Sequence, residues 1–149
     1  MFVEFMQEQL LLFIALLVVV LMLVYSYVGD KISGFKTVST DEAIRLYNDE
    51  AFVLDVRSAG EYREGYIGNA LNISVSELPA KLSQLPADKT QPILVYCLSG
   101  GRSSRAAGIL AKNGYQSVFN LSGGITAWKA GGLPVGRERS KKNRKNPQS

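Results

Sequence analysis

The sequence predicts an α/β fold, with a central, mostly parallel five-stranded sheet and helices on both faces, preceded by one N-terminal transmembrane helix. Strand-like and helix-like stretches alternate between residues 35 and 135, which is typical of a parallel sheet with crossover helices. The strand candidates are continuous apolar runs, which indicates that both faces of the sheet are buried. Ahead of them, residues 10–28 carry no charged side chain.

The expected elements follow in chain order. The strand candidates are short apolar runs at residues 35–38, 52–55, 70–73, 93–96 and 117–119. The first helix candidate begins at Ser39, and the other four occupy residues 59–64, 77–85, 103–112 and 125–130. Ser39, followed three residues later by Glu42, is typical of a capping box at a helix start. Gly65 and Gly114 are the stop signals of the second and fourth helices.

The net charge of +4 is unevenly distributed along the 149 residues. An acidic flank precedes the apolar segment, the central part is nearly balanced, and the C-terminal end is strongly basic. These shifts divide the chain into a flank (1–9), a transmembrane helix (10–28), a linker (29–34), a domain (35–135) and a basic tail (136–149). The domain is long enough to bury one core, whereas the tail has no apolar stripe and is expected to be disordered.

The apolar segment 10–28 would span about 28 Å as a helix, close to the thickness of the bilayer hydrocarbon core. Tyr25 and Tyr27 lie at one end, where aromatic rings favour the headgroup region. A cleaved signal peptide would need a basic N-terminal region and a small-residue cleavage site, and the sequence shows neither. Basic residues follow the segment from Lys31 onwards and none precedes it, so the C-terminal domain is expected in the cytoplasm.

The chain contains one cysteine, Cys97, and no histidine. A single cysteine excludes an internal disulfide framework, and a reducing cytoplasm would keep it a free thiol. The absence of histidine excludes a Ser–His or Cys–His dyad within the chain, and it excludes the usual Cys/His zinc sites. We therefore expect no metal site and no cofactor.

The segment that carries chemistry is the loop after the fourth strand candidate. Cys97 follows that strand and a helix begins near Ser103, so the thiol is expected at the carboxyl end of the sheet, where ligands bind. Gly100 and Gly101 let successive N–H groups turn inward, while the helix N-terminus and Arg102 add positive charge. These features favour a lowered pKa for Cys97 and hence its nucleophilic thiolate. In the alternative interpretation, Cys97 is a small buried hydrophobe and the glycines only form a turn.

Four segments in order resemble the rhodanese-like domains over about residues 34–135. They are Leu54-Asp55-Val56-Arg57, the stretch from Glu61-Tyr62 to Ala70, the C-x-x-G-x-R-S loop at 97–103, and the stretch 121–134 with its Gly-Gly pair and Trp128. The resemblance implies a sulfurtransferase, in which the cysteine accepts a sulfane sulfur as a persulfide. That sulfur is then passed to a thiol or another nucleophile.

The resemblance also implies roles for individual residues. Cys97 would be the catalytic persulfide carrier, and the amides that cradle the transferred sulfur would be those of Leu98, Ser99, Gly100, Gly101 and Arg102. The Arg102 side chain would help to hold an anionic donor such as thiosulfate. Asp55 and Arg57 would orient the site through ion pairs. Glu61 is expected to be a solvated or capping residue, Trp128 to pack in the core, and Tyr66 occupies a position where the family often has histidine.

Two other functions stay open at this point. Cysteine phosphatases resemble a wider C-x5-R loop, whereas four residues separate Cys97 from Arg102, so this loop suits a single sulfur better than a phosphoryl group. A membrane-anchored binding or scaffold protein is the other alternative, because a fold alone does not establish an activity. Single-pass rhodanese-like proteins of bacterial inner membranes have the same arrangement, which implies that location and a protein partner in the membrane.

The expected partners are small molecules and lipid. An anionic sulfur donor and a thiol acceptor would meet the loop, and the bilayer would surround residues 10–28. The basic tail 136–149 is expected either to stay solvated or to contact anionic lipid, at about 1 kcal/mol per Lys or Arg near the surface. Nucleic acid is disfavoured because the tail has no aromatic side chain to stack on bases.

Overall fold

The computed structural model describes residues 1–137, apart from the side chains of Asp30 and Lys31. The chain forms two compact units, residues 1–33 and the residues from 34 onwards. The first unit is the helix α1 (Phe2–Ser33). The second is an α/β domain that contains β1 (Lys36–Val38), α2 (Thr40–Asn48), β2 (Phe52–Asp55), α3 (Ala59–Glu64), β3 (Leu71–Asn72), the 3-10 helices η1 (Leu78–Ala80) and η2 (Leu82–Gln84), β4 (Ile93–Tyr96), α4 (Gly101–Lys112), β5 (Val118–Leu121) and α5 (Gly124–Ala130).

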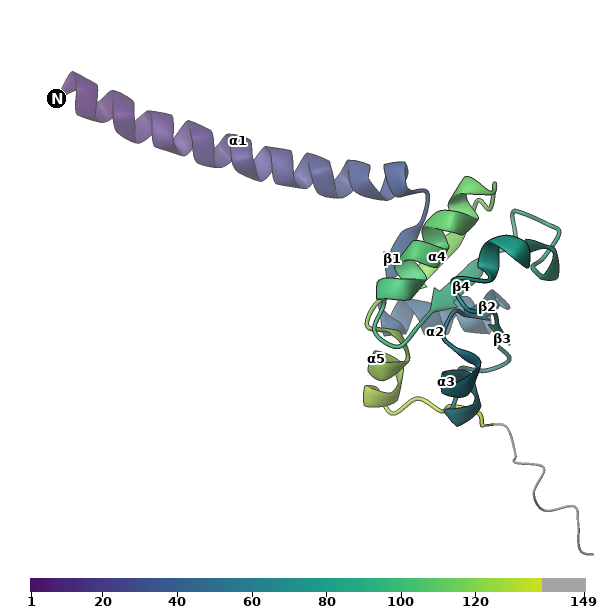
Figure 1. The fold of residues 1–149 in the computed structure, drawn as a ribbon. Helices are drawn as coiled ribbons and strands as arrows, with labels where there is room; N and C mark the ends of the chain where they lie inside the picture. The colour runs from purple at the N-terminus through teal and green to yellow at the C-terminus, as the bar shows by residue number, and fades with distance from the viewer. Residues whose placement is uncertain (138–149) are drawn as a thin grey trace, which may run out of the picture. The chain divides into compact units, whose positions relative to one another are not determined.

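The five strands form one sheet in the order β1-β5-β4-β2-β3, and every pair in it is parallel (Figure 1). The register places Asp55 of β2 beside Tyr96 of β4, and Val95 of β4 beside Asn120 of β5. Because parallel strands point the same way, their carboxyl ends meet at one edge of the sheet. The predicted α/β fold with a five-stranded parallel sheet is confirmed.

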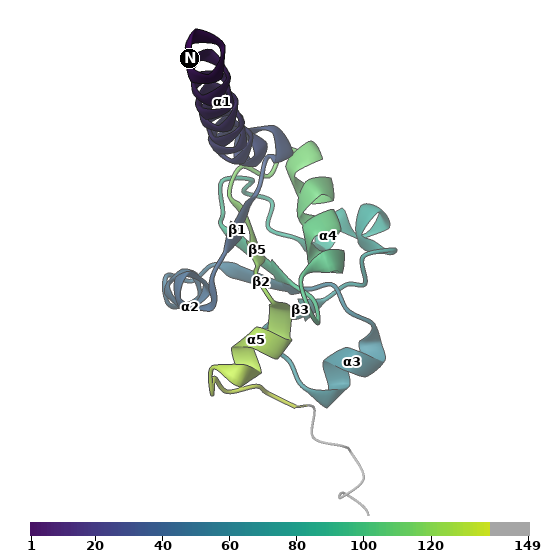
Figure 2. The ribbon, with the colours of Figure 1, turned by 90° about the vertical axis from the view of Figure 1, so that its left-hand side faces the viewer.

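Side chains along β4 alternate between two hydrophobic cores. Ile93 and Val95 pack with residues of α4 and the 3-10 segment, whereas Leu94 and Tyr96 pack with residues of α2 and α5. Figure 2 shows α4 and α2 on opposite sides of the sheet. Since both faces are covered, all four residues of β4 are buried, which explains the continuous apolar run of this strand.

One helix expectation is wrong. We predicted a single helix over residues 77–85, and the structure has the two short 3-10 helices η1 and η2 there. Pro79 lacks an N–H and limits an α-helix to its first turn, and Pro86 favours the extended conformation at Leu85. The leucines nevertheless face the core as expected, because Leu78 and Leu85 are buried.

The N-terminal helix is longer than the predicted segment 10–28. It takes in most of the flank 1–9 and continues through most of the linker 29–34, since no proline interrupts this region. The helix ends before Gly34, whose φ of +75° is left-handed and favours glycine. Residues Phe2–Gly29 are long and apolar enough to cross a membrane.

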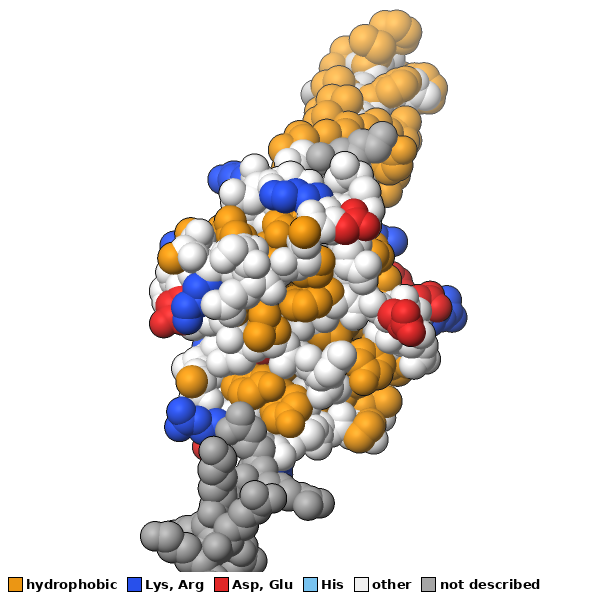
Figure 3. Space-filling view, turned by 90° about the vertical axis from the view of Figure 1, so that its right-hand side faces the viewer, with side chains coloured by type: hydrophobic (Ala, Val, Ile, Leu, Met, Phe, Trp, Pro, Cys, Tyr) orange, Lys and Arg blue, Asp and Glu red, His pale blue; other side chains and the backbone are white. Residues whose placement is uncertain are grey.

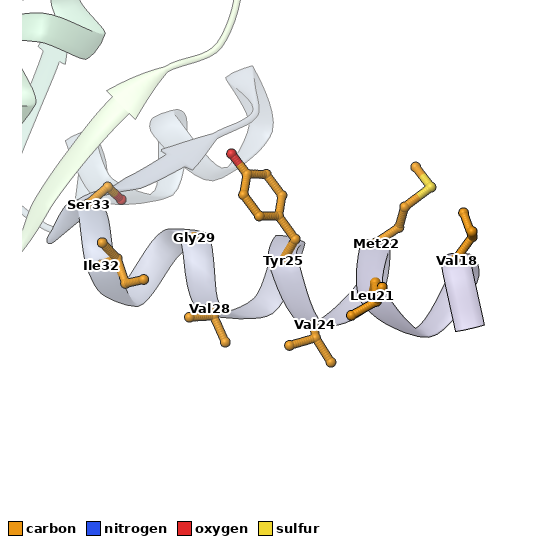
Figure 4. Close-up of a pocket in the computed structure, with 9 residues that line it drawn as sticks. All are labelled: Val18, Leu21, Met22, Val24, Tyr25, Val28, Gly29, Ile32 and Ser33. Atoms are coloured by element: carbon orange, nitrogen blue, oxygen red, sulfur yellow. The ribbon is translucent and has the colours of Figure 1, made fainter. Parts of the chain in front are cut away.

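Apolar side chains cover α1 and are exposed around its whole circumference. On the face of α1 that is visible in Figure 3, hydrophobic side chains predominate. A shallow hollow runs along the second half of the helix, and the side chains of Leu21, Val24 and Val28 project beside it (Figure 4). A helix that is apolar on every side buries nothing against itself, so its surface requires an apolar medium or partner.

Gly136, the first residue of the predicted tail 136–149, is hydrogen-bonded to the domain. Gly136 N–H donates to the Tyr66 carbonyl at 2.8 Å, and Tyr66 N–H donates to the Gly136 carbonyl at 2.9 Å. The pairing therefore extends one residue past the predicted boundary at 135. The remainder of that basic tail, residues 138–149, lies outside the described residues.

Candidate active site

The loop that carries Cys97 connects β4 to α4. Helix α4 begins at Gly101, two residues earlier than the predicted start at Ser103, and Gly100 is its N-cap residue with φ +114°. Only glycine adopts this left-handed conformation without strain. The sharp turn returns the chain toward Cys97, so that the sulfur lies at the N-terminus of α4.

Several hydrogen-bond donors surround the Cys97 sulfur. The Gly100 N–H lies 3.0 Å from Sγ, and the Ser103 hydroxyl lies 3.3 Å from it. The backbone N–H groups of Ser99 and Ser103 are also directed at the sulfur. The thiol is free and only 1% exposed, so these donors face it within a largely dry environment.

These donors decide the protonation of Cys97. Burial by itself raises the pKa of the thiol, because a charge is poorly solvated inside the protein. The hydrogen bonds from the Ser103 hydroxyl and from the backbone N–H groups of Ser103, Gly100 and Ser99 outweigh burial, so the pKa lies below its usual value. The loop therefore favours the thiolate, which is the nucleophilic form.

Ser103 and Asn120 contribute to the site and were not predicted from the sequence. The Ser103 hydroxyl is fully buried, and besides Cys97 it contacts Asn120 Oδ1 at 2.6 Å and the Gly100 carbonyl at 3.2 Å. Asn120 comes from the middle of β5, the strand beside β4. The sequence signal for Asn120 is a polar residue within an apolar strand, because such a side chain needs a hydrogen-bond partner when it is buried.

Helix α5 holds the outer side of the same loop. The N–H groups of Ile125 and Thr126 donate to the carbonyls of Cys97 and Leu98, at 2.9 and 3.2 Å. Gly124 has φ +56°, and a Cβ on it would collide with those two carbonyl groups. Because the carbonyls turn toward α5, the N–H groups of the loop are left to face the sulfur.

Arg102 forms an ion pair that was not predicted from the sequence. Its Nη1 and Nη2 atoms donate to Oε1 and Oε2 of Glu61 at 2.8 and 2.9 Å. Glu61 also completes a capping box with Ser58 at the start of α3, so the capping expectation for Glu61 is confirmed. The hydrogen bonds from Arg102 lower the pKa of Glu61 to about 2.

Asp55 and Arg57 form a buried ion pair at the end of β2. Arg57 Nη2 lies 2.6 Å from Asp55 Oδ2 and also donates to the Gly65 carbonyl at 2.6 Å. The Tyr96 hydroxyl donates to Asp55 Oδ2 at 2.8 Å. Burial and then the nearby Asp55 charge raise the pKa of Tyr96, which keeps its hydroxyl protonated. This network fixes the residue that directly precedes Cys97.

The remaining predicted residues lie at the edge of the site or away from it. Leu98 is 47% exposed beside Cys97, and Tyr66 stacks on Tyr62 with their ring centroids 4.4 Å apart. Trp128 is buried and donates to the Pro134 carbonyl at 3.0 Å, which confirms its packing role. Within residues 1–137, no three His, Cys, Asp or Glu side chains gather closely enough to hold a metal ion.

A polarised thiol at the carboxyl end of a central parallel strand defines a class of proteins that transfer groups through cysteine. A family model described as rhodanese-like domain matches residues 39–131. The chain therefore belongs to the rhodanese-like domain family.

Individual relatives agree with this assignment. A sulfurtransferase of Allochromatium vinosum is 37% identical over 87 residues, which cover 58% of this chain and 79% of that protein. The thiosulfate sulfurtransferase GlpE of Coxiella burnetii is 38% identical over 97 residues, 64% of this chain and 89% of that protein. The crystal structure of a rhodanese-related protein from Thermoplasma volcanium superimposes with a TM-score of 0.63 and 33% identity, covering 69% of this chain and 99% of that structure.

Proposed function

We propose that this protein is a membrane-tethered sulfurtransferase that carries sulfane sulfur as a persulfide on Cys97. The observation that carries the proposal is the ring of donors around the Cys97 sulfur, with the Gly100 N–H at 3.0 Å and the Ser103 hydroxyl at 3.3 Å. Such donors stabilise a thiolate before the reaction and a persulfide anion after it. The sulfurtransferase names of relatives from two organisms support the same chemistry.

In the first step, the Cys97 thiolate attacks the outer sulfur of a donor such as thiosulfate. A bond forms between Sγ and that sulfur, the S–S bond of the donor breaks, and sulfite leaves with the electron pair. The loop amides of Leu98, Ser99, Gly100, Gly101 and Arg102 are the proposed cradle for the transferred sulfur. The Arg102 guanidinium contributes positive charge near an anionic donor, and the Glu61 carboxylate that pairs with it offsets much of that charge.

In the second step, an acceptor thiolate or cyanide attacks the outer sulfur of the persulfide. The bond between that sulfur and Sγ breaks, and the electron pair returns to Cys97 as a thiolate. The same donors that lowered the pKa of Cys97 stabilise this leaving group. No proton relay through histidine is required, in keeping with a chain that has none.

We place the protein in the bacterial inner membrane, with α1 spanning the bilayer once and the domain in the cytoplasm. The apolar, exposed surface of residues Phe2–Gly29 supports a span. Lys36 and Arg45 follow the helix, while the charged side chains before residue 10 are the acidic Glu4 and Glu8, and the positive-inside rule then gives the orientation. The cytoplasmic side is also the reducing side, where Cys97 stays a thiol.

A phosphatase activity is less well supported. Four residues separate Cys97 from Arg102. The two terminal nitrogens of Arg102 are hydrogen-bonded to the Glu61 carboxylate. A phosphoryl group needs several donors around its equatorial oxygens, and this loop directs its donors at the sulfur. If the protein is instead a binding protein that uses the rhodanese fold without catalysis, Cys97 should never gain sulfur.

The decisive experiment follows sulfur onto Cys97. The full chain in detergent is incubated with thiosulfate and cyanide, thiocyanate is measured, and intact-mass spectrometry detects the gain of one sulfur atom. Cys97→Ser should lose both signals, because Cys97 is the only cysteine in the chain. Ser104→Ala, which alters a serine next to the loop, is the control and should keep both. A folded wild-type chain that gains no sulfur would favour the binding protein.

A further inference from the structure

Arg102, the cation of the loop, does not present its full charge to a donor. Its two terminal nitrogens pair with the two carboxylate oxygens of Glu61 at 2.8 and 2.9 Å. The pair joins the first turn of α4 to α3, and the partners are 41 positions apart in the sequence. The side chains are 40% and 32% exposed, so the pair lies at the surface where a donor arrives.

The pairing has two consequences for an incoming anion. The parallel N–H groups at the end of the guanidinium, which match an oxyanion bidentately, are already bonded to a carboxylate. Glu61 also stays ionised throughout the physiological pH range, because the Arg102 hydrogen bonds lower its pKa to about 2. The net charge of the pair is therefore zero, and Glu61 repels an approaching anion.

We propose that Glu61 is a specificity-determining residue, which disfavours doubly charged oxyanion donors such as thiosulfate and thereby favours singly charged organic persulfides. The inference rests on the proposed sulfurtransferase function. With a persulfide donor R–S–SH, the Cys97 thiolate bonds to the outer sulfur and the donor S–S bond breaks. The thiolate R–S⁻ leaves with the electron pair, and the proton stays on the transferred sulfur.

The chain offers matched variants for a test. Glu61→Gln removes the charge but keeps an oxygen for Arg102 and the side chain that a capping box accepts. Ser58→Ala removes the hydroxyl that caps α3 at the Glu61 N–H and leaves the Glu61 charge in place. A change caused by loss of the helix cap would appear in both variants, whereas a change caused by charge would appear only in Glu61→Gln.

The experiment uses the full chain in detergent with cyanide as the common acceptor. The donor is either thiosulfate or 2-hydroxyethyl persulfide, whose persulfide is its only ionisable group and which therefore carries at most one negative charge. We expect Glu61→Gln to lower KM for thiosulfate about five- to tenfold with kcat within about twofold, the scale of one partly screened charge acting on a dianion. The ratio of kcat/KM for thiosulfate to that for the persulfide should rise by a similar factor. The increase should shrink in high salt, and Ser58→Ala should not show it.

Two outcomes overturn the inference in distinguishable ways. If wild-type turnover depends on Cys97 but Glu61→Gln leaves KM for thiosulfate unchanged or raises it, Glu61 serves only to position Arg102 and the specificity role is wrong. If neither donor places sulfur on Cys97 in the folded wild-type or variant chain, both the proposed sulfurtransferase function and this inference are wrong.

Discussion

The hydroxyl oxygen of Ser103 lies 3.3 Å from the sulfur of Cys97, one helical turn into α4. The same oxygen lies 2.6 Å from Asn120 Oδ1. A hydroxyl has one proton, and both the sulfur and Asn120 Oδ1 accept it, so Asn120 holds the serine beside the sulfur and shares its proton with Cys97. The position of one side chain thus depends on a strand that follows it in the sequence.

Replacing Ser103 by alanine should raise the pKa of Cys97. One hydrogen bond to a charged acceptor contributes about 1.5 kcal/mol, which corresponds to about one pKa unit. The thiolate fraction at neutral pH should therefore fall several-fold. The measurement is the pH dependence of iodoacetamide alkylation, which reports only Cys97 because the chain has one cysteine. Ser104→Ala should leave the profile in place, and an unshifted profile in Ser103→Ala would contradict the assignment.

Gly124→Ala should disable the loop. An added Cβ would collide with the carbonyl groups of Cys97 and Leu98, and the φ of +56° disfavours any residue with a side chain. We expect the loss of persulfide formation and a cost to stability of about 1–3 kcal/mol. Gly108→Ala in α4 is the control, because a Cβ there meets nothing within 4 Å and alanine favours a helix. Equal activity in the two variants would rule out the bracing role of α5.

Breaking the buried ion pair should destabilise the domain. Arg57→Ala leaves the Asp55 carboxylate, which is 0% exposed, without its partner, at a cost of about 3–5 kcal/mol in the free energy of unfolding. Urea denaturation followed by circular dichroism measures it. Lys81→Ala, which breaks the exposed Lys81–Glu77 pair, should cost less than about 1 kcal/mol. A similar loss in the free energy of unfolding for the two variants would mean that the buried Asp55–Arg57 pair does not stabilise the fold more than an exposed pair does.

Lowering the pH should remove the stability that the Glu61–Arg102 ion pair contributes. The pKa of Glu61 falls from 4.5 to about 2 in the folded protein, so the pair stabilises the fold above pH 4.5. That contribution is lost as the pH falls from 4.5 toward about 2. Wild type should therefore lose more stability over this range than Glu61→Gln, which has no carboxylate at position 61. Thermal unfolding temperatures at several pH values test this, and parallel curves would exclude it.

A charge in the centre of α1 should prevent stable membrane insertion. Each arginine at a bilayer centre costs about 2.5–3.5 kcal/mol on insertion scales, so the double change Leu16→Arg and Val19→Arg should shift the protein to the soluble fraction after an alkaline wash. Ser76→Arg, at an exposed position of the domain, should stay in the membrane. Protease added to intact spheroplasts should leave the wild-type domain undigested. Digestion of the domain would show that it lies outside the cytoplasm and that the proposed orientation is wrong.

Much of the fold could be predicted because local patterns determined it. The apolar run of β4 was predicted with its observed bounds, since a strand buried on both faces allows only apolar side chains. The segment 77–85 was misjudged because its leucines have helical spacing, while the prolines at 79 and 86 restrict the backbone. The spacing of the buried leucines favours one α-helix, whereas the prolines allow only short 3-10 helices. The hydrophobic periodicity alone does not distinguish these two structures.

The site was only partly predictable, for a different reason. The order of Cys97, the glycines and Arg102 is local and visible in the sequence. The partners that refine the site come from elsewhere, namely Asn120 in β5, Gly124 in α5 and Glu61 in α3. Those contacts depend on which strands become neighbours, and strand order is not written in any short segment.

The order of the strands also bears on how the protein is made. Strand β1 has β5 as its partner, and the Cys97 loop is held by groups from β5 and α5. A chain emerging from the ribosome therefore has neither the neighbour of β1 nor the bracing of its thiol until β5 and α5 have been translated. Contacts of such long sequence separation form late and slowly. The reactive cysteine is thus an ordinary thiol during synthesis and becomes an activated one only when the domain closes.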